Sequence, residues 1–86
     1  MTIQTTRRFD KSYAKLSEQN KSRVDVALSL FMTEPFSPPL GDHALQGKLK
    51  GLRSISAGHD LRIIYKEQGR HVIVMLLEVG THDQVY

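Results

Sequence analysis

One helical repeat constrains the fold of this chain more than any other feature of its sequence. Apolar side chains recur at positions 24, 27, 28, 31 and 32, the spacing that lines one face of a helix. Ser17 is suited to cap the start of this helix. Pro35 forces an end near Thr33, because proline disfavours helical angles in the residue before it. The sequence therefore predicts an amphipathic helix that needs an apolar partner.

A shorter repeat precedes that helix. Phe9, Tyr13 and Leu16 are spaced by four and three residues, which also lines one helical face. Asp10 is the predicted cap of this short helix. The two segments together predict a helical hairpin with one shared apolar seam.

The second half of the chain has the pattern of strands. Residues 35–47 hold all three prolines and form a predicted loop. From Lys48 the pattern is strand-like, with Gly51 as a predicted bulge, and residues 61–66 alternate between two faces. Residues 67–70 predict a hairpin turn, and 71–79 a central strand that Gly80 ends. With an edge strand at 2–6, the predicted fold is α+β: a two-helix hairpin packed on a small, mainly antiparallel four-stranded sheet in the order β-α-α-β-β-β.

Composition limits the classes of protein that fit. With 86 residues the chain predicts one domain, 1–86, and the absence of cysteine excludes a disulfide scaffold, a thiol nucleophile and cysteine-based zinc sites. The longest apolar run, 72–77, is too short to span a membrane. The start of the chain has no hydrophobic signal core, so we expect a cytoplasmic protein. The net charge of +3 is compatible with nucleic acid but not diagnostic of it.

Cations gather in the predicted strand region, where Asp60 is the only acid between residues 44 and 66. Side chains on neighbouring strands would form a basic surface that attracts phosphate backbones. The alternative is that an exposed sheet face needs charge for solubility, and the cations alone favour that alternative. They are Lys48, Lys50, Arg53, Arg62 and Lys66.

Histidines offer proton-transfer chemistry near neutral pH. His43 ends the proline-rich loop, His59 lies in a turn, and His82 follows the last strand, and such positions often carry catalytic groups. His71 is predicted to be structural or solvated. No pair has the helical spacing of a zinc enzyme, so no metal site is expected. A local surface hydrogen bond is the alternative for each histidine, and a frayed end is the alternative for Tyr86, which would otherwise stack on a base.

Three segments, 42–53, 59–66 and 79–86, resemble the RelE/ParE superfamily of bacterial toxins, closest to the YafQ-like branch of RelE-type mRNA interferases. Residues 9–16 also look like the first helix of that family. The resemblance therefore extends over nearly the whole chain and implies the RelE-like microbial RNase fold. It further implies a type II toxin that cleaves messenger RNA on the ribosome and is neutralised by a cognate antitoxin.

The resemblance also implies roles for individual residues. His43, Asp60 and His82 match the loop histidine, the catalytic aspartate and the C-terminal catalytic histidine of the YafQ-like branch. Arg62 matches the RelE arginine that faces the scissile phosphate, and Tyr86 a terminal aromatic residue. We expect Lys48, Lys50, Arg53 and Lys66 to hold RNA, with neither metal nor cofactor.

Two positions depart from the branch, which has a histidine where this chain has Ser56 and a tryptophan where it has Leu61. His59 is a candidate to replace the missing histidine. Two alternatives stay open: a ParE-like DNA gyrase poison on the same fold, and a catalytically weak relative that binds RNA or antitoxin. Promoter DNA is expected as a partner only through the antitoxin complex, and no membrane is expected as a partner.

Overall fold

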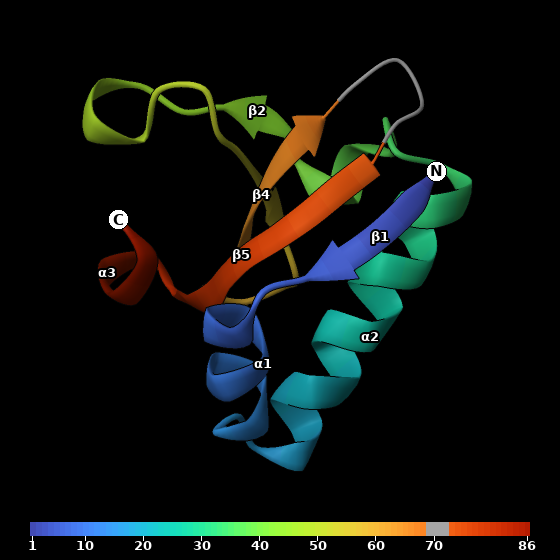
Figure 1. The fold of residues 1–86 in the computed structure, drawn as a ribbon. Helices are drawn as coiled ribbons and strands as arrows, with labels where there is room; N and C mark the ends of the chain where they lie inside the picture. Colours follow the sequence, from blue (N-terminus) through green and yellow to red (C-terminus); the bar gives the residue numbers. More distant parts are fainter. Residues whose placement is uncertain (69–72) are drawn as a thin grey trace.

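The computed structural model of the protein describes residues 1–68 and 73–86. A five-stranded sheet runs in the order β1-β5-β4-β3-β2, in which β1 is parallel to β5 and all other pairs are antiparallel (Figure 1). The helices and strands are β1 (Thr2–Thr5), α1 (Arg7–Ala14), α2 (Glu18–Thr33), β2 (His43–Ala44), β3 (Arg53–Ser56), β4 (Leu61–Gln68), β5 (Ile73–Thr81) and α3 (His82–Val85). The predicted α+β class is confirmed, but the sheet has a fifth strand, β2, that the sequence did not predict.

The two helices of the hairpin form as predicted, although Leu16 of the first repeat lies beyond the end of α1 and one cap differs. Ser17 accepts a hydrogen bond from the backbone N–H of Asn20 and caps α2, which ends at Thr33 as predicted. The cap of α1 is Thr6, whose hydroxyl accepts from the N–H of Phe9, so the prediction of Asp10 was wrong. Thr6 also donates to the carbonyl of Leu76 in β5, so it joins the start of α1 to the sheet.

The core lies between the hairpin and one face of the sheet. Phe31 of α2 packs against Tyr65 of β4 with ring centroids 5.0 Å apart. Met32, part of the predicted apolar stripe, is 53% exposed and lies outside this core. The buried apolar residues of the cluster are Phe9, Val24, Ala27, Phe31, Leu40, Ile55, Ala57, Leu61, Ile63, Tyr65, Val74, Leu76 and Val79.

Two glycines delay the start of the strand that was predicted to begin at Lys48, which is β3 in the structure. Gly47 and Gly51 have φ of 65° and 93°, angles that glycine adopts without strain. Residues 47–49 therefore form a 3-10 turn, and β3 begins only at Arg53. The register shift lies between Ile64 and Tyr65 in the pairing of β4 with β5, so the predicted bulge at Gly51 was wrong.

The last strand lies inside the sheet, between β1 and β4, as predicted for residues 71–79. It continues through Gly80 to Thr81, and the expected tail contains α3. Residues 69–70 of the predicted turn, and His71 with the start of the predicted strand, lie outside the described residues. Within the described residues no helix has the length and apolar character needed to cross a membrane.

Candidate functional site

The strand register divides the candidate residues between the two faces of the sheet. His43 pairs with Ser54, and Ser54 with Ile64, so these three side chains share one face. Arg62 is two residues from Ile64 on β4 and pairs with Ser56, which puts it on the same face. We call this the site face. It is opposite to the face that α2 covers, which carries Ile63.

The C-terminal segment lies against the site face. The hydroxyl of Tyr86 is 2.5 Å from the Oγ of Ser54, which is fully buried. The His82 ring contacts the Tyr86 ring edge-on, with centroids 4.5 Å apart and planes at 85°. Tyr86 is therefore ordered over the sheet, although 43% of it stays exposed. Tyr86 thus contacts Ser54 of β3 and His82 of α3, and His43 of β2 is the register partner of Ser54 on the same face.

Ser54 was missed by the sequence analysis. The signal for it is a serine at an inward position of a strand, because a buried hydroxyl needs a hydrogen-bonding partner. That partner is Tyr86, 32 positions further along the chain.

A backbone carbonyl determines which ring nitrogen of His43 carries the proton in the neutral form. Its Nδ1 lies 2.8 Å from the carbonyl oxygen of Gly41, and a carbonyl can only accept a hydrogen bond. Nδ1 therefore carries the proton, and the neutral ring presents the lone pair of Nε2. The side chain is exposed at a two-residue strand, so Nε2 is available to an incoming ligand.

Arg62 reaches toward the turn between β3 and β4. Its Nη1 donates to the carbonyl oxygens of Leu61 and His59 and to the Oγ of Ser56, at 2.9, 3.3 and 3.4 Å. Ser56, which the resemblance places where the YafQ-like branch has a histidine, therefore accepts a hydrogen bond from this arginine. The guanidinium thus stays at the edge of the site face with its direction fixed by the turn.

The turn itself carries His59 and Asp60, both exposed. His59 adopts φ 46°, and its backbone carbonyl, not its ring, is the group that meets Arg62. Among the described residues no hydrogen bond or ion pair joins the His59 ring or the Asp60 carboxylate to His43 or His82. Leu61 is buried in the core, away from the site face.

The predicted RNA-binding cations fall into separate groups. Lys48 lines a hollow with Tyr86 beside the site, and exposed Lys50 follows in the same segment. Lys66 is also exposed on β4, but lies four residues, about 13 Å, beyond Arg62. Arg53 pairs with Tyr65, so it projects from the opposite face of the sheet. There it bonds Asp42, and its hydrogen bond with Tyr65 raises the pKa of its guanidinium.

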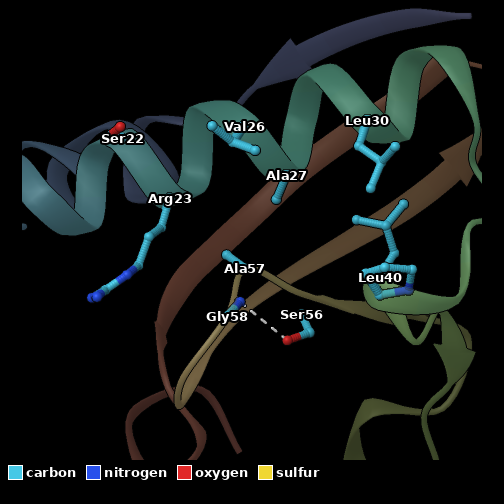
Figure 2. A pocket seen from close by; sticks show the side chains of 10 residues that line it. Ser22, Arg23, Val26, Ala27, Leu30, Leu40, Ser56, Ala57 and Gly58 are labelled. Carbon is cyan, nitrogen blue, oxygen red and sulfur yellow. Dashed lines mark hydrogen bonds between the residues drawn. The ribbon is translucent and has the colours of Figure 1, made fainter.

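An apolar groove lies between the β3–β4 turn and α2. It measures about 320 Å³ and lies between α2 and the segments around Leu40 and Ala57. In Figure 2 Ala27 and Leu30 point from α2 toward Ala57 and Leu40, and Val26 lies beside them on the helix. Within the described part of the chain, no three acidic or histidine side chains group in a way that would hold a metal ion.

The arrangement of a two-helix layer on a mixed sheet is found in solved bacterial toxins. The YafQ structure from E. coli strain BL21(DE3) has a TM-score of 0.78 at 22% identity, covering 98% of this chain and 96% of that chain. The E. coli DinJ-YafQ toxin-antitoxin complex gives 0.76 at 25%, covering 98% and 94%. A YoeB/ParE toxin from Agrobacterium tumefaciens gives 0.78 at 15%, covering 95% and 99%. The fold is therefore that of the RelE/ParE superfamily.

Family comparison identifies the branch. All of the chain, residues 1–86, matches the family described as the bacterial toxin of type II toxin-antitoxin system, YafQ. The chain belongs to this YafQ toxin family. Comparison with curated protein sequences finds no match.

Proposed function

We propose that the protein is a ribosome-dependent mRNA endoribonuclease whose site is the site face of the sheet. The observation that carries the proposal is the arrangement around Ser54: His43 pairs beside it, Tyr86 bonds it, and His82 packs on Tyr86. Two imidazoles, an aromatic ring and the nearby Arg62 supply proton transfer, stacking and positive charge. RNA cleavage through the 2′-hydroxyl needs these groups and no nucleophile from the protein.

The reaction begins with a base that removes the proton of the 2′-hydroxyl. The oxygen then forms a bond to the adjacent phosphorus, and the bond from phosphorus to the 5′-oxygen breaks. An acid gives its proton to that leaving oxygen. The products are a 2′,3′-cyclic phosphate, or the 3′-phosphate formed from it, and a 5′-hydroxyl end.

His43 and His82 are the acid-base pair in this scheme. His43 in its Nδ1–H form has a free lone pair on Nε2, which suits it to act as the base. His82, whose Nδ1 lies 3.6 Å from the Oδ1 of Asp83, is assigned the role of the acid that protonates the leaving oxygen. We keep Asp60, with His59 near it, as an orienting group or alternate base that substrate would bring into contact.

The other candidate residues would stabilise negative charge on the phosphate, stack on an RNA base or hold the RNA backbone. Arg62 would stabilise the negative charge that develops on the phosphoryl oxygens, which fixed cations do without reorganising. Tyr86 would stack on an unpaired base. Lys48, Lys50 and Lys66 would hold the RNA backbone, whereas Arg53 is left out because it projects from the other face.

The ribosome would supply the positioning that this open site lacks. Holding the message in reactive geometry removes an entropic part of the barrier, and exposed His43 and His82 leave room for a large substrate. Such a substrate would place the action of the toxin in the cytoplasm.

A cognate antitoxin is the second proposed partner. The DinJ-YafQ complexes, 25% identical to this chain, are toxin-antitoxin assemblies of the same fold. The apolar groove along α2 offers a surface for an apolar antitoxin segment, next to the turn that orients Arg62. Any promoter DNA would be bound through the antitoxin.

Induction in a bacterial host with primer extension on an abundant message tests the proposal. The wild-type chain should arrest growth and create new 5′ ends in frame with codons. His82→Ala and Arg62→Ala should lower cleavage by roughly 10²-fold or more. Lys11→Ala, an exposed cation on α1, is the control that should cut normally. Arrest without new RNA ends would favour a gyrase poison, and no arrest an inactive relative.

A further inference from the structure

Three polar side chains close a ring beneath the loop that carries His43. The hydroxyl of Tyr65 is 2.7 Å from both carboxylate oxygens of Asp42. Nε of Arg53 donates to the Asp42 Oδ1 at 3.2 Å and to the Tyr65 hydroxyl oxygen at 3.3 Å. The tyrosine thus accepts from the arginine and donates to the aspartate, and each of the three groups contacts the other two.

Tyr65 joins this ring to the core, while Arg53 and Asp42 are partly exposed. Tyr65 is fully buried, with its ring against Phe31, and its position on β4 is fixed by pairing on both sides. Burial raises the pKa of Tyr65 well above its ordinary value of 10, with the hydrogen bond to Asp42 as the next cause. The hydroxyl therefore keeps its proton, and its bond to Asp42, at any working pH.

The loop above the ring runs between two buried side chains, Leu40 and Leu45, and the exposed residues between them are held by few other contacts. β2 contains only two residues and pairs on one side, with β3. Gly41, with φ 53°, ends the preceding 3-10 turn in the left-handed conformation. Asp42 lies between Gly41 and His43, so the ring anchors the loop between the carbonyl that fixes the imidazole and the imidazole itself.

We propose that Tyr65 and Arg53 are positioning residues that act through Asp42 to hold His43 as its Nδ1–H tautomer. They lie on the face of the sheet opposite to the site and touch no substrate. Only the catalytic consequence, that His43 then acts as a base, rests on the proposed function. The positioning itself is a property of the free protein and can be measured without RNA.

Tyr65→Phe is the direct test, because it keeps the buried ring and removes the hydroxyl. Tyr13→Phe is a matched control, since the Tyr13 hydroxyl donates to Asp25 at 2.7 Å and also joins a tyrosine to an aspartate, but between the two helices. Asp42→Asn is a second variant that keeps an oxygen acceptor for Tyr65 and tests the charge toward Arg53. Circular dichroism and thermal unfolding identify the variants that remain folded.

Nitrogen-15 NMR of the imidazole gives the first readout. In the wild type and in Tyr13→Phe, His43 should show the shifts of a ring protonated at Nδ1. In Tyr65→Phe it should move toward the mixture of tautomers of a free histidine. An unchanged His43 spectrum in Tyr65→Phe, or an equal change in Tyr13→Phe, would overturn the proposal.

Cleavage of message in a purified translation system gives the second readout. Tyr65→Phe should cut roughly 10- to 100-fold more slowly, as expected when a catalytic group is misplaced by about 1 Å. Normal cleavage by Tyr65→Phe with an altered His43 spectrum would contradict a role in catalysis. If the wild type cuts nothing, the proposed function fails, and the NMR comparison still tests the positioning.

Discussion

His43 and Tyr65 show how single atoms control this site. A backbone carbonyl places the proton of His43, and a buried hydroxyl holds the loop from which that carbonyl comes. Neither effect depends on the identity of the substrate. A histidine exposed on a loop would otherwise sample both tautomers, whereas this local geometry leaves the Nε2 lone pair of His43 directed to solvent, where a proton could be taken up.

Tyr65 should also leave a signature in stability at alkaline pH. Below pH 10 both the folded and the unfolded chain keep its proton, so it adds no pH dependence. Above pH 10 the unfolded chain loses the proton and the folded chain keeps it, because the folded pKa is raised. The free energy of unfolding should then fall by about 1.4 kcal/mol per pH unit from this group alone.

Urea unfolding of wild type and Tyr65→Phe between pH 7 and 11 measures this contribution. The variant should be less stable at neutral pH, where it lacks the hydrogen bonds, and the gap between the two proteins should narrow above pH 10. A gap that stays constant to pH 11 would show that Tyr65 ionises normally in the folded state.

At the scale of elements, α3 carries His82, the histidine to which the proposed mechanism gives the role of acid. Thr81 and Gln84 form a capping box, in which the hydroxyl accepts from the Gln84 N–H and the amide oxygen accepts from the Thr81 N–H. Gly80 makes room for it, since a Cβ there would lie 2.8 Å from Gln84 Oε1 and 3.2 Å from Val85 Cγ1. A side chain at position 80 would therefore push the Gln84 amide out of the position that closes the box.

Gly80→Ala should displace α3 and with it His82 and Tyr86. We expect a loss of cleavage of roughly tenfold or more with the rest of the sheet intact, because the clash falls on the C-terminal segment. Primer extension measures the loss, and hydrogen exchange of β4 amides serves as the check on the sheet. Unchanged cleavage would mean that α3 tolerates the methyl group and that its placement matters less than proposed.

The sequence predicts the long elements and the short edge strand β1, but it misses β2 and α3 for a physical reason. The repeat from Val24 to Phe31 spans several turns, so its period is visible, and Pro35 marks its end. β2 and α3 have two and four residues, too few to show a period, and tertiary contacts decide them. The cap of α1 at Thr6 depends in the same way on a bond to β5.

The candidate site is predictable in its residue types and less so in its geometry. His43, Arg62, His82 and Tyr86 are all named from the sequence; in the structure His43 pairs with Ser54, Tyr86 bonds it, and His82 contacts Tyr86. Arg53 could not be assigned from sequence, because a shift of one residue moves a strand side chain to the other face. Gly47 and Gly51 interrupt the alternation of side chains between the two faces, so the sequence pattern does not show which face carries Arg53.

At the scale of the whole molecule, the two sides of the sheet separate the proposed functions. RNA would meet the site face, while the apolar groove lies along α2 beside the core. The two surfaces approach each other at the β3–β4 turn, where Ser56 lines the groove and also accepts from Arg62. An antitoxin segment in the groove would thus contact a residue that orients the site.

Val26→Asp tests whether the groove binds the antitoxin independently of the site face. Val26 is 66% exposed in the groove, so the chain should fold and stay toxic, while binding of the antitoxin should weaken by roughly tenfold or more. Met32→Asp is the matched control on the same helix, 53% exposed and outside the groove lining. Growth rescue by co-expressed antitoxin and a binding titration measure the effect. Equal rescue of both variants would remove the groove from the antitoxin interface.

The most direct test of the account uses the RNA rather than the protein. A purified translation system is programmed with a message in which one nucleotide, on the 5′ side of a mapped cut, carries 2′-deoxyribose. If the protein acts by proton transfer to and from RNA, as the arrangement of His43, His82 and Arg62 implies, the cut at that position disappears while others remain. Cleavage there at the normal rate would contradict attack by the 2′-hydroxyl and the roles assigned to these residues.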